Sequence, residues 1–205
     1  MQVQTLEIPE VKLIIPSIHR DERGFFSETF NARALVASGI KDDFVQDNHS
    51  LSVQRGVVRG LHFQIPPNAQ AKLVSCTRGA IFDVAVDLRR GSPSFGFWIA
   101  ARLDHASCAQ LYIAAGFAHG YCTIEPDSEV AYKVSAFYAP ENEHGILWND
   151  QGLKIGWPAT EAQALLGPRD LQLPRLAEYD SPFTYDGMPL SVPNGTVLTP
   201  DPSKG

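Results

Sequence analysis

The stretch Ala80-Ile-Phe-Asp-Val-Ala-Val-Asp-Leu88 alternates in the manner of a β-strand and sets the fold class of the chain. Its even positions, from Phe82 to Leu88, are all large and apolar, whereas the odd positions include Asp83 and Asp87. Successive side chains of a strand point to opposite faces of a sheet. The pattern therefore predicts a half-buried strand, with the two aspartates on its polar face.

Short stretches rich in Val, Ile, Phe and Tyr recur on both sides of this one, and Gly or Pro separates many of them. The predicted strands cover residues 11–15, 56–64, 72–77, 80–88, 95–103, 109–113 and 129–138. The clearest helix covers residues 31–38, with Asn31 as its N-cap and Gly39 as its stop. Many short strands with little helix predict an antiparallel sandwich or barrel.

The composition limits the classes of partner. The chain has 205 residues, and 17 Lys and Arg against 23 Asp and Glu give a formal net charge of −6. This charge argues against a nucleic-acid or anionic-membrane surface, and no apolar run approaches the roughly 18 residues of a membrane span. The three cysteines lack CxxC spacing and no signal peptide is visible, so we expect a cytoplasmic protein.

The proline content divides the chain. Large apolar residues become scarce after Ser181, and five prolines follow it. We therefore expect one domain over residues 1–182 and a loosely packed Pro-rich extension over residues 183–205.

Candidate chemistry is concentrated in Arg55-Gly-Val-Val-Arg-Gly-Leu-His-Phe-Gln64, with Lys72 on the next predicted strand. A histidine with several cationic groups could bring a base and anion-binding residues into one pocket. Arg59 and His62 are an odd number of positions apart and should face opposite ways, so we interpret Gly60 as a bulge that restores a common face. On the strand over 129–138, even spacing puts Tyr132 and Tyr138 on one face.

A Gly-rich turn, Ala114-Ala-Gly-Phe-Ala-His-Gly120, places His119 at the start of a further strand. A similar turn supplies one metal ligand in metal-binding cupins, where an earlier strand supplies an HxH pair. Here that strand has His62-Phe-Gln64, with one histidine and a neutral amide. We therefore expect no metal, and a metal-dependent oxygenase is an unfavoured alternative.

Taken together, these and other stretches resemble the dTDP-4-dehydrorhamnose 3,5-epimerase family from about Leu13 to about Pro182. The matching stretches lie at 21–28, 44–50, 58–64, 70–74, 82–89, 91–96, 116–120, 132–133 and 145–150. The resemblance implies a mainly β, cupin-type double-stranded β-helix jelly roll with a few short helices. It also implies no cofactor and a homodimer in which N-terminal segments cross between subunits.

The resemblance also implies roles for individual residues. His62 would be the general base, Asp170 would orient it, Tyr132 would be the general acid, and Lys72 would stabilise an enolate oxygen. Tyr138 would stack on thymine. The other residues matched to contacts with the nucleotide sugar are Arg23, Glu28, Gln46, Asn48, Arg59, His119, Glu143 and Arg169.

The implied reaction is inversion of C3 and C5 of dTDP-4-dehydro-6-deoxy-D-glucose, giving dTDP-4-dehydro-L-rhamnose. A C4 ketone acidifies the hydrogens on both carbons, and inversion needs a base and an acid on opposite faces of the sugar. Two alternatives stay open at this point. One is a mono-epimerase that inverts C3 or C5 alone, and the other is a nucleotide-sugar-binding cupin without catalysis.

Overall fold

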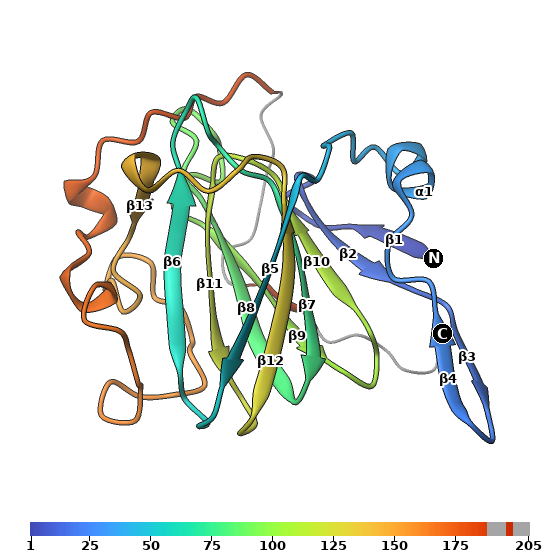
Figure 1. Ribbon diagram of the computed structural model, residues 1–205. Coiled ribbons are helices and arrows are strands. Elements are labelled where there is room, and N and C mark those ends of the chain that lie inside the picture. The colour runs from blue at the N-terminus through green and yellow to red at the C-terminus, as the bar shows by residue number, and fades with distance from the viewer. Residues whose placement is uncertain (188–195, 199–205) are drawn as a thin grey trace.

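Two six-stranded sheets form the body of the protein in the computed structural model, which describes residues 1–187 and 196–198 (Figure 1). The first sheet contains β1 (Gln2–Thr5), β2 (Val11–Ile15), β10 (Gln110–Ile113), β7 (Lys72–Arg78), β12 (Ser128–Val134) and β5 (Gln46–Ser52), in that order. The second contains β13 (Glu143–Gly145), β6 (Val58–Gln64), β11 (Phe117–Thr123), β8 (Ala80–Asp87), β9 (Trp98–Asp104) and β14 (Thr196–Leu198).

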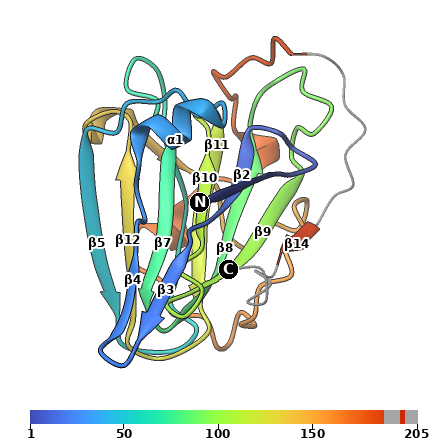
Figure 2. The same cartoon turned by 90° about the vertical axis from the view of Figure 1, so that its right-hand side faces the viewer.

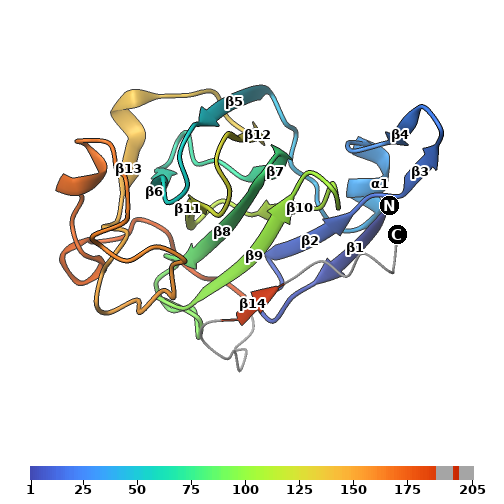
Figure 3. The same ribbon diagram turned by 90° about the horizontal axis from the view of Figure 1, so that it is seen from below.

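The two sheets face each other, and their facing side chains form the main core (Figures 1 and 2). Neighbouring strands are antiparallel except β14, which pairs in parallel with β9 at the sheet edge (Figure 3). All seven predicted strands are present, and the prediction of a mainly β antiparallel fold is confirmed. None of the described helices is long and apolar enough to cross a membrane.

Strand β8 differs from its prediction, because both of its faces are buried. The odd face, with Ile81 and Ala85, belongs to the core between the sheets. The even face packs under Ile146, Leu153 and other residues of the segment that follows β13. That covering segment explains why the prediction of a half-buried strand was wrong. Asp83 and Asp87 are on the odd face, so they lie inside the protein, with no exposed surface.

Short helices and one hairpin complete the fold. Helix α1 (Ala32–Ala37) begins as predicted at Asn31, whose side chain accepts hydrogen bonds from the backbone N–H groups of Arg33 and Ala34. The remaining elements are the hairpin of β3 (Ile18–Asp21) and β4 (Gly24–Ser27) and the 3-10 helices η1 (Pro140–Asn142), η2 (Asp170–Gln172) and η3 (Leu176–Glu178). The hairpin extends away from the two sheets (Figures 1 and 3).

The first residues of the predicted extension are packed. Phe183 is 8% exposed and joins the core on the outer face of the second sheet. The Arg89 guanidinium lies over the ring of Tyr185 at 4.9 Å. The backbone of Thr184 pairs with that of Arg90 in an isolated parallel β-bridge. The predicted loose packing is therefore wrong at residues 183–185, since their aromatic side chains cover apolar surface. Most of the predicted extension lies outside the described residues.

Candidate active site

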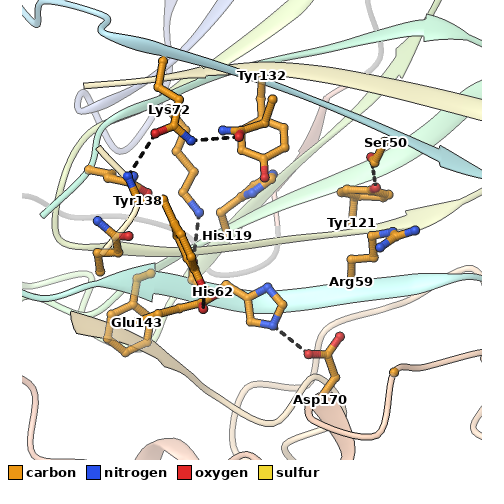
Figure 4. Close-up of a pocket in the computed structure, with 16 residues that line it drawn as sticks. Ser50, Arg59, His62, Lys72, His119, Tyr121, Tyr132, Tyr138, Glu143 and Asp170 are labelled. Carbon is orange, nitrogen blue, oxygen red and sulfur yellow. Dashed lines mark hydrogen bonds and ion pairs between the residues drawn. The ribbon is translucent and has the colours of Figure 1, made fainter. Parts of the chain in front are cut away.

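A cavity of about 370 Å³ opens between the two sheets, and it gathers most of the predicted site residues (Figure 4). Ten of the thirteen predicted residues line it: Gln46, Asn48, Arg59, His62, Lys72, His119, Tyr132, Tyr138, Glu143 and Asp170. Strands β5, β7 and β12 supply side chains from one sheet, and β6 and β11 from the other. A ligand in the cavity would therefore meet protein groups on two opposite faces.

His62 and Asp170 form a close pair on one wall of this cavity. The Nε2 atom of His62 lies 2.7 Å from Oδ1 of Asp170. Asp170 is the first residue of the helix η2 and is 7% exposed. The segment after β13 therefore passes close to β6 and places a buried carboxylate beside the imidazole. An ionised carboxylate only accepts hydrogen bonds, so it holds a proton on Nε2 and leaves Nδ1 as the acceptor of a neutral ring.

A β-bulge at Gly60 puts Arg59 and His62 on the same side, as predicted. In the pairing with β11, His62 is opposite His119 and Arg59 is opposite Tyr121, so two residues of β6 face one of β11. Gly60 has a φ of +122°, and a Cβ there would lie 2.5 Å from the Cα of Gly120. Only glycine suits this conformation and this close approach.

Tyr132 and Lys72 enter the cavity from the sheet opposite His62 (Figure 4). Burial raises the pKa of the Tyr132 phenol, so that it stays protonated at neutral pH. Lys72 is buried, and its Nζ atom donates to the backbone carbonyl of His62 at 3.3 Å. Burial lowers the pKa of Lys72 to about 8, although the charges of Glu143 and Asp83 oppose that shift. The site thus holds an ammonium that is easily deprotonated.

Tyr138, Glu143 and Arg169 form a polar network at the mouth of the cavity. The Tyr138 hydroxyl donates to Oε2 of Glu143 at 2.7 Å, and Arg169 Nη1 donates to the same oxygen at 2.5 Å. Burial acts to raise the pKa of Glu143, but the hydrogen bonds from Tyr138 and Arg169 outweigh it and lower that pKa. Arg169 does not line the cavity itself.

The predicted strand over residues 129–138 is shorter in the structure, because β12 ends at Val134. Tyr138 therefore shares no strand face with Tyr132. It reaches the cavity from the following loop, where its backbone N–H donates to Oε1 of Gln46 at 3.0 Å. The side-chain amide of Gln46 also donates to Oδ1 of Asn48 at 2.9 Å. Gln46 therefore links its strand neighbour Asn48 to the loop that carries Tyr138.

Two predicted residues, Arg23 and Glu28, do not reach this cavity. Arg23 lies at the tip of the β3–β4 hairpin, with 88% of its side chain exposed, and pairs with Asp21 at 2.6 Å. Glu28 accepts a hydrogen bond from Asn31 at 3.0 Å. Within one chain the structure therefore separates these two residues from the rest of the predicted site.

The sequence predictions missed several residues of the site. Tyr121 and Ser50 line the cavity, and their hydroxyl oxygens are 2.9 Å apart. Asp83 lies behind the wall, with Oδ1 at 2.7 Å from Nε2 of His119. Alternation along β8 places Asp83 correctly on the face opposite Phe82. The strands of the facing sheet make this face a barrel interior, and the local pattern along β8 does not reveal them.

Gln64 occupies the position where the HxH pair of a metal-binding cupin has its second histidine. Its buried amide donates to the backbone carbonyls of Asn68 and Phe137 and accepts from the N–H of Ala139. The side chain thus holds the loop that carries Tyr138. Across the described part of the chain, no three His, Cys, Asp or Glu side chains are grouped so that they could hold a metal ion.

Comparison with known proteins places the chain in a family. Residues 5–178 match the dTDP-4-dehydrorhamnose 3,5-epimerase family. A Pseudomonas aeruginosa protein of that name is 50% identical over 181 residues, which cover 88% of this chain and 98% of the relative. A Streptomyces niveus dTDP-4-dehydrorhamnose 3-epimerase is 43% identical over 179 residues, which cover 87% and 85% of the two chains.

A solved structure gives the same result for the fold. The dTDP-6-deoxy-D-glucose-3,5-epimerase of Legionella pneumophila, in complex with dTDP-4-keto-L-rhamnose, superposes with a TM-score of 0.86 at 43% identity. The match covers 91% of this chain and 99% of that one. The predicted cupin-type jelly roll is thereby confirmed.

Fold and cavity together define a cupin-like enzyme, with titratable groups on two facing walls. It is an isomerase acting on carbohydrates. The chain belongs to the dTDP-4-dehydrorhamnose 3,5-epimerase family.

Proposed function

We propose that the protein inverts C3 and C5 of dTDP-4-dehydro-6-deoxy-D-glucose and produces dTDP-4-dehydro-L-rhamnose. The observation that carries the proposal is the placement of His62, paired with Asp170, and Tyr132 on opposite walls of one cavity. Inversion at carbon requires a proton to leave one face and another to arrive at the opposite face. The proposed substrate is supported by the names of relatives that share up to 50% of their residues with this chain.

His62 is the general base in this proposal. Its Nδ1 atom takes the proton of C3 or C5, and the electron pair of the broken C–H bond forms the enolate of the C4 ketone. Asp170 then faces an imidazolium at 2.7 Å and stabilises it, while also keeping the ring in the required tautomer. A base positioned in this way contributes on the order of 10²–10⁴ in rate.

Lys72 and Tyr132 complete the step. The Lys72 ammonium donates to the oxygen that becomes negative, which is most effective in a buried site. The Tyr132 phenol gives its proton to the carbon from the other face, and the ketone re-forms. Tyr132 then regains a proton and His62 loses one, so the enzyme returns to its starting state. Protons alone are exchanged and no electron is gained or lost, so the reaction needs no redox cofactor.

The nucleotide would bind towards the mouth of the cavity. Arg59, held by its bonds to the Ser52 hydroxyl and the Leu51 carbonyl, presents a guanidinium suited to diphosphate oxygens. Tyr138 is 53% exposed at the mouth, and its ring offers a stacking surface for thymine. Gln46, Asn48, Glu143 and Arg169 surround this outer part of the proposed site.

A homodimer would complete the site. The β3–β4 hairpin exposes Phe25 and Phe26, at 52% and 70%, beside Arg23. Exposed aromatic side chains on a projecting hairpin indicate a surface covered by a partner. We propose that this hairpin crosses to a second copy and brings Arg23 and Glu28 to its cavity.

The charged substrate and the free cysteines further favour a cytoplasmic location.

The experiment that tests this function follows solvent exchange at the sugar. Purified protein is incubated with dTDP-4-dehydro-6-deoxy-D-glucose in D₂O, and the C3 and C5 protons are followed by NMR. His62→Asn serves as the test variant, and His105→Asn, which lies outside the cavity, is the matched control. We expect deuterium at both carbons with the wild type and the control, and at neither carbon with His62→Asn.

The other outcomes identify the alternatives. Exchange at one carbon alone would indicate a mono-epimerase, a reading favoured by the 43% identical relative named as a 3-epimerase. Tight binding of the substrate without exchange at either carbon would contradict the proposal and indicate a binding protein.

A further inference from the structure

Asp83 is a buried carboxylate that none of the proposed chemical steps uses. It lies on the central strand β8 and has no exposed surface. Oδ1 is 2.7 Å from Nε2 of His119, whereas Oδ2 is buried without a hydrogen-bond partner. A buried carboxylate with unmet hydrogen-bonding capacity is costly, and a purely structural position favours an uncharged residue. The placement therefore calls for a functional reason.

Strand pairing explains how Asp83 reaches His119. In the β11–β8 ladder, His119 is opposite Ala85 and Tyr121 is opposite Asp83, so Asp83 and His119 are diagonal neighbours on the inner face. The small side chain of Ala85 leaves room for this diagonal contact. His119 lines the cavity, whereas Asp83 does not. Asp83 thus supports the imidazole from behind, on the side away from a ligand.

This contact decides which nitrogen of His119 carries the proton. The ionised carboxylate can only accept, so Nε2 is the protonated nitrogen. Burial lowers the pKa of His119, and this effect outweighs the opposing charge of Asp83. In the resulting neutral ring, Nδ1 has a lone pair and no proton. His119 can then accept a hydrogen bond from a ligand but cannot donate one.

We propose that Asp83 is a positioning residue, which fixes His119 as the acceptor of a hydrogen bond from a sugar-ring hydroxyl of the substrate. Lys72 lines the same cavity (Figure 4). Its ammonium can only donate, so it is left as the partner of the carbonyl oxygen. The two neighbouring groups would thus distinguish a hydroxyl from a ketone on one sugar. This inference rests on the proposed function for the sugar, but the tautomer of His119 is a property of the protein alone.

The decisive measurement is the ¹⁵N spectrum of histidine-labelled protein at pH 7.5, with His119 assigned by its absence in His119→Asn. We expect a neutral ring protonated at Nε2 in the wild type. Adding dTDP-glucose, which has ring hydroxyls but no ketone, should shift the Nδ1 resonance, whereas dTDP alone should leave it in place. A ring protonated at Nδ1, with or without dTDP-glucose, would overturn the inference.

Asp83→Asn supplies the second test, because an amide can donate to Nε2 and so move the proton to Nδ1. We expect that tautomer in the spectrum, with kcat/KM lower by roughly 10- to 100-fold and dTDP affinity unchanged within about threefold. Asp87→Asn is the matched control, since Asp87 shares the strand face but bonds to Arg89, Ser92 and Ser94. Its His119 spectrum should match the wild type. An unchanged tautomer in Asp83→Asn would contradict the positioning role.

These measurements separate the two proposals. An absence of exchange at C3 and C5 would contradict the proposed function. It would not decide the role of Asp83, because the tautomer of His119 is observed in the spectrum without turnover. Should Asp83→Asn fail to fold, the wild-type spectra with dTDP-glucose and with dTDP decide it alone.

Discussion

The Oδ1 atom of Asp170 lies 2.7 Å from Nε2 of His62, although the two residues are 108 positions apart in the chain. His62 comes from β6 of the second sheet, and Asp170 comes from the short helix η2, which follows β13 in the chain. The barrel therefore supplies the imidazole, while the segment that covers its outer face supplies the carboxylate. In the proposed mechanism, stable packing of that segment is therefore a condition for catalysis.

Asp170→Asn should lower kcat by about 10²–10⁴-fold. The amide can donate to Nε2, which would place the proton on the nitrogen that must accept one. Affinity for dTDP should change little, because the pair faces the sugar end of the proposed site. Steady-state kinetics and calorimetric titration with dTDP check both expectations. Asp180→Asn is the control, since that carboxylate is 89% exposed and pairs with Arg90, and a kcat for Asp170→Asn within threefold of that control would contradict the role.

Tyr132→Phe should separate the two halves of the reaction. The variant keeps His62 and Asp170, so the C3 or C5 proton can still leave and return on the same face. It lacks the phenol that, in the proposed mechanism, delivers a proton from the opposite wall. We expect deuterium exchange to persist at a reduced rate while the inverted product falls by roughly 10²-fold or more. Equal losses of exchange and inversion would show that Tyr132 acts elsewhere. Tyr112→Phe, a tyrosine outside the cavity, is the control.

The buried ammonium of Lys72 should give the enzyme an alkaline limb. Its pKa is lowered to about 8, and only the protonated form can stabilise an enolate oxygen. Activity should therefore fall as the pH rises through about 8. Lys72→Arg should move this limb to higher pH, because a guanidinium keeps its proton. Lys72→Met should lower kcat by about 10²–10³-fold and remove the limb. A limb that is unchanged in Lys72→Met would belong to another group.

The same pKa affects stability in a definite direction. Lys72 loses its proton near pH 8 in the folded state but near 10.5 when unfolded, so the unfolded chain binds more protons between these values. The free energy of unfolding should therefore rise with pH across this window, relative to Lys72→Met, by up to about 3 kcal/mol. Urea unfolding of both proteins at pH 7.5, 9 and 10.5 measures the difference. A difference that is constant with pH would contradict the burial of a charged Lys72.

Mixing two inactive variants should restore activity if the hairpin crosses between subunits. Arg23→Ala lacks the proposed hairpin contact, and His62→Asn lacks the proposed base. In a mixed dimer, the cavity of the Arg23→Ala chain keeps His62 and receives Arg23 from its partner, so one complete site forms. We expect the mixture, after exchange of subunits, to regain roughly a quarter of wild-type activity, since half of the dimers would be mixed and each would have one complete site of two.

Arg33→Ala is the control for this experiment, since Arg33 is an exposed residue of α1. That variant alone should have wild-type activity. A mixture of Arg23→Ala and His62→Asn that stays as inactive as its components would show that Arg23 serves its own chain or has no role. Light scattering on the same samples would establish whether dimers are present.

Local patterns account for most of what the sequence predicted. Alternation located β8, and spacing of Gly60 within its strand predicted the bulge that joins Arg59 and His62, because both depend on neighbours within a few residues. Strand β5 was missed because Gln46–Ser52 is largely polar and has no apolar alternation to detect. Its role is visible only in the fold, where it borders the cavity.

Long-range packing accounts for the rest. The burial of Asp83 depends on the facing sheet, whose strands β2, β7, β10 and β12 close over the odd face of β8, and no local pattern reveals neighbours so distant in sequence. The place of Tyr138 depends on where β12 stops pairing with β5, at Val134 and Gln46. The family resemblance indicated that His62 and Asp170 act together, but only the structure gives the distance between them.

Phe183→Ala tests the boundary of the folded domain. Phe183 is 8% exposed and contacts Phe63 edge-to-face, with ring centroids 6.1 Å apart. Truncating a buried phenylalanine should lower the free energy of unfolding by about 3–5 kcal/mol, through lost burial and the cavity left behind. Val197→Ala, at a residue 52% exposed on β14, should change it by less than about 0.5 kcal/mol. Urea unfolding at one fixed protein concentration compares the three proteins, because dimerisation would make stability depend on concentration. Equal midpoints would mean that the domain ends before Phe183, and that the aromatic contact with Phe63 contributes nothing to stability.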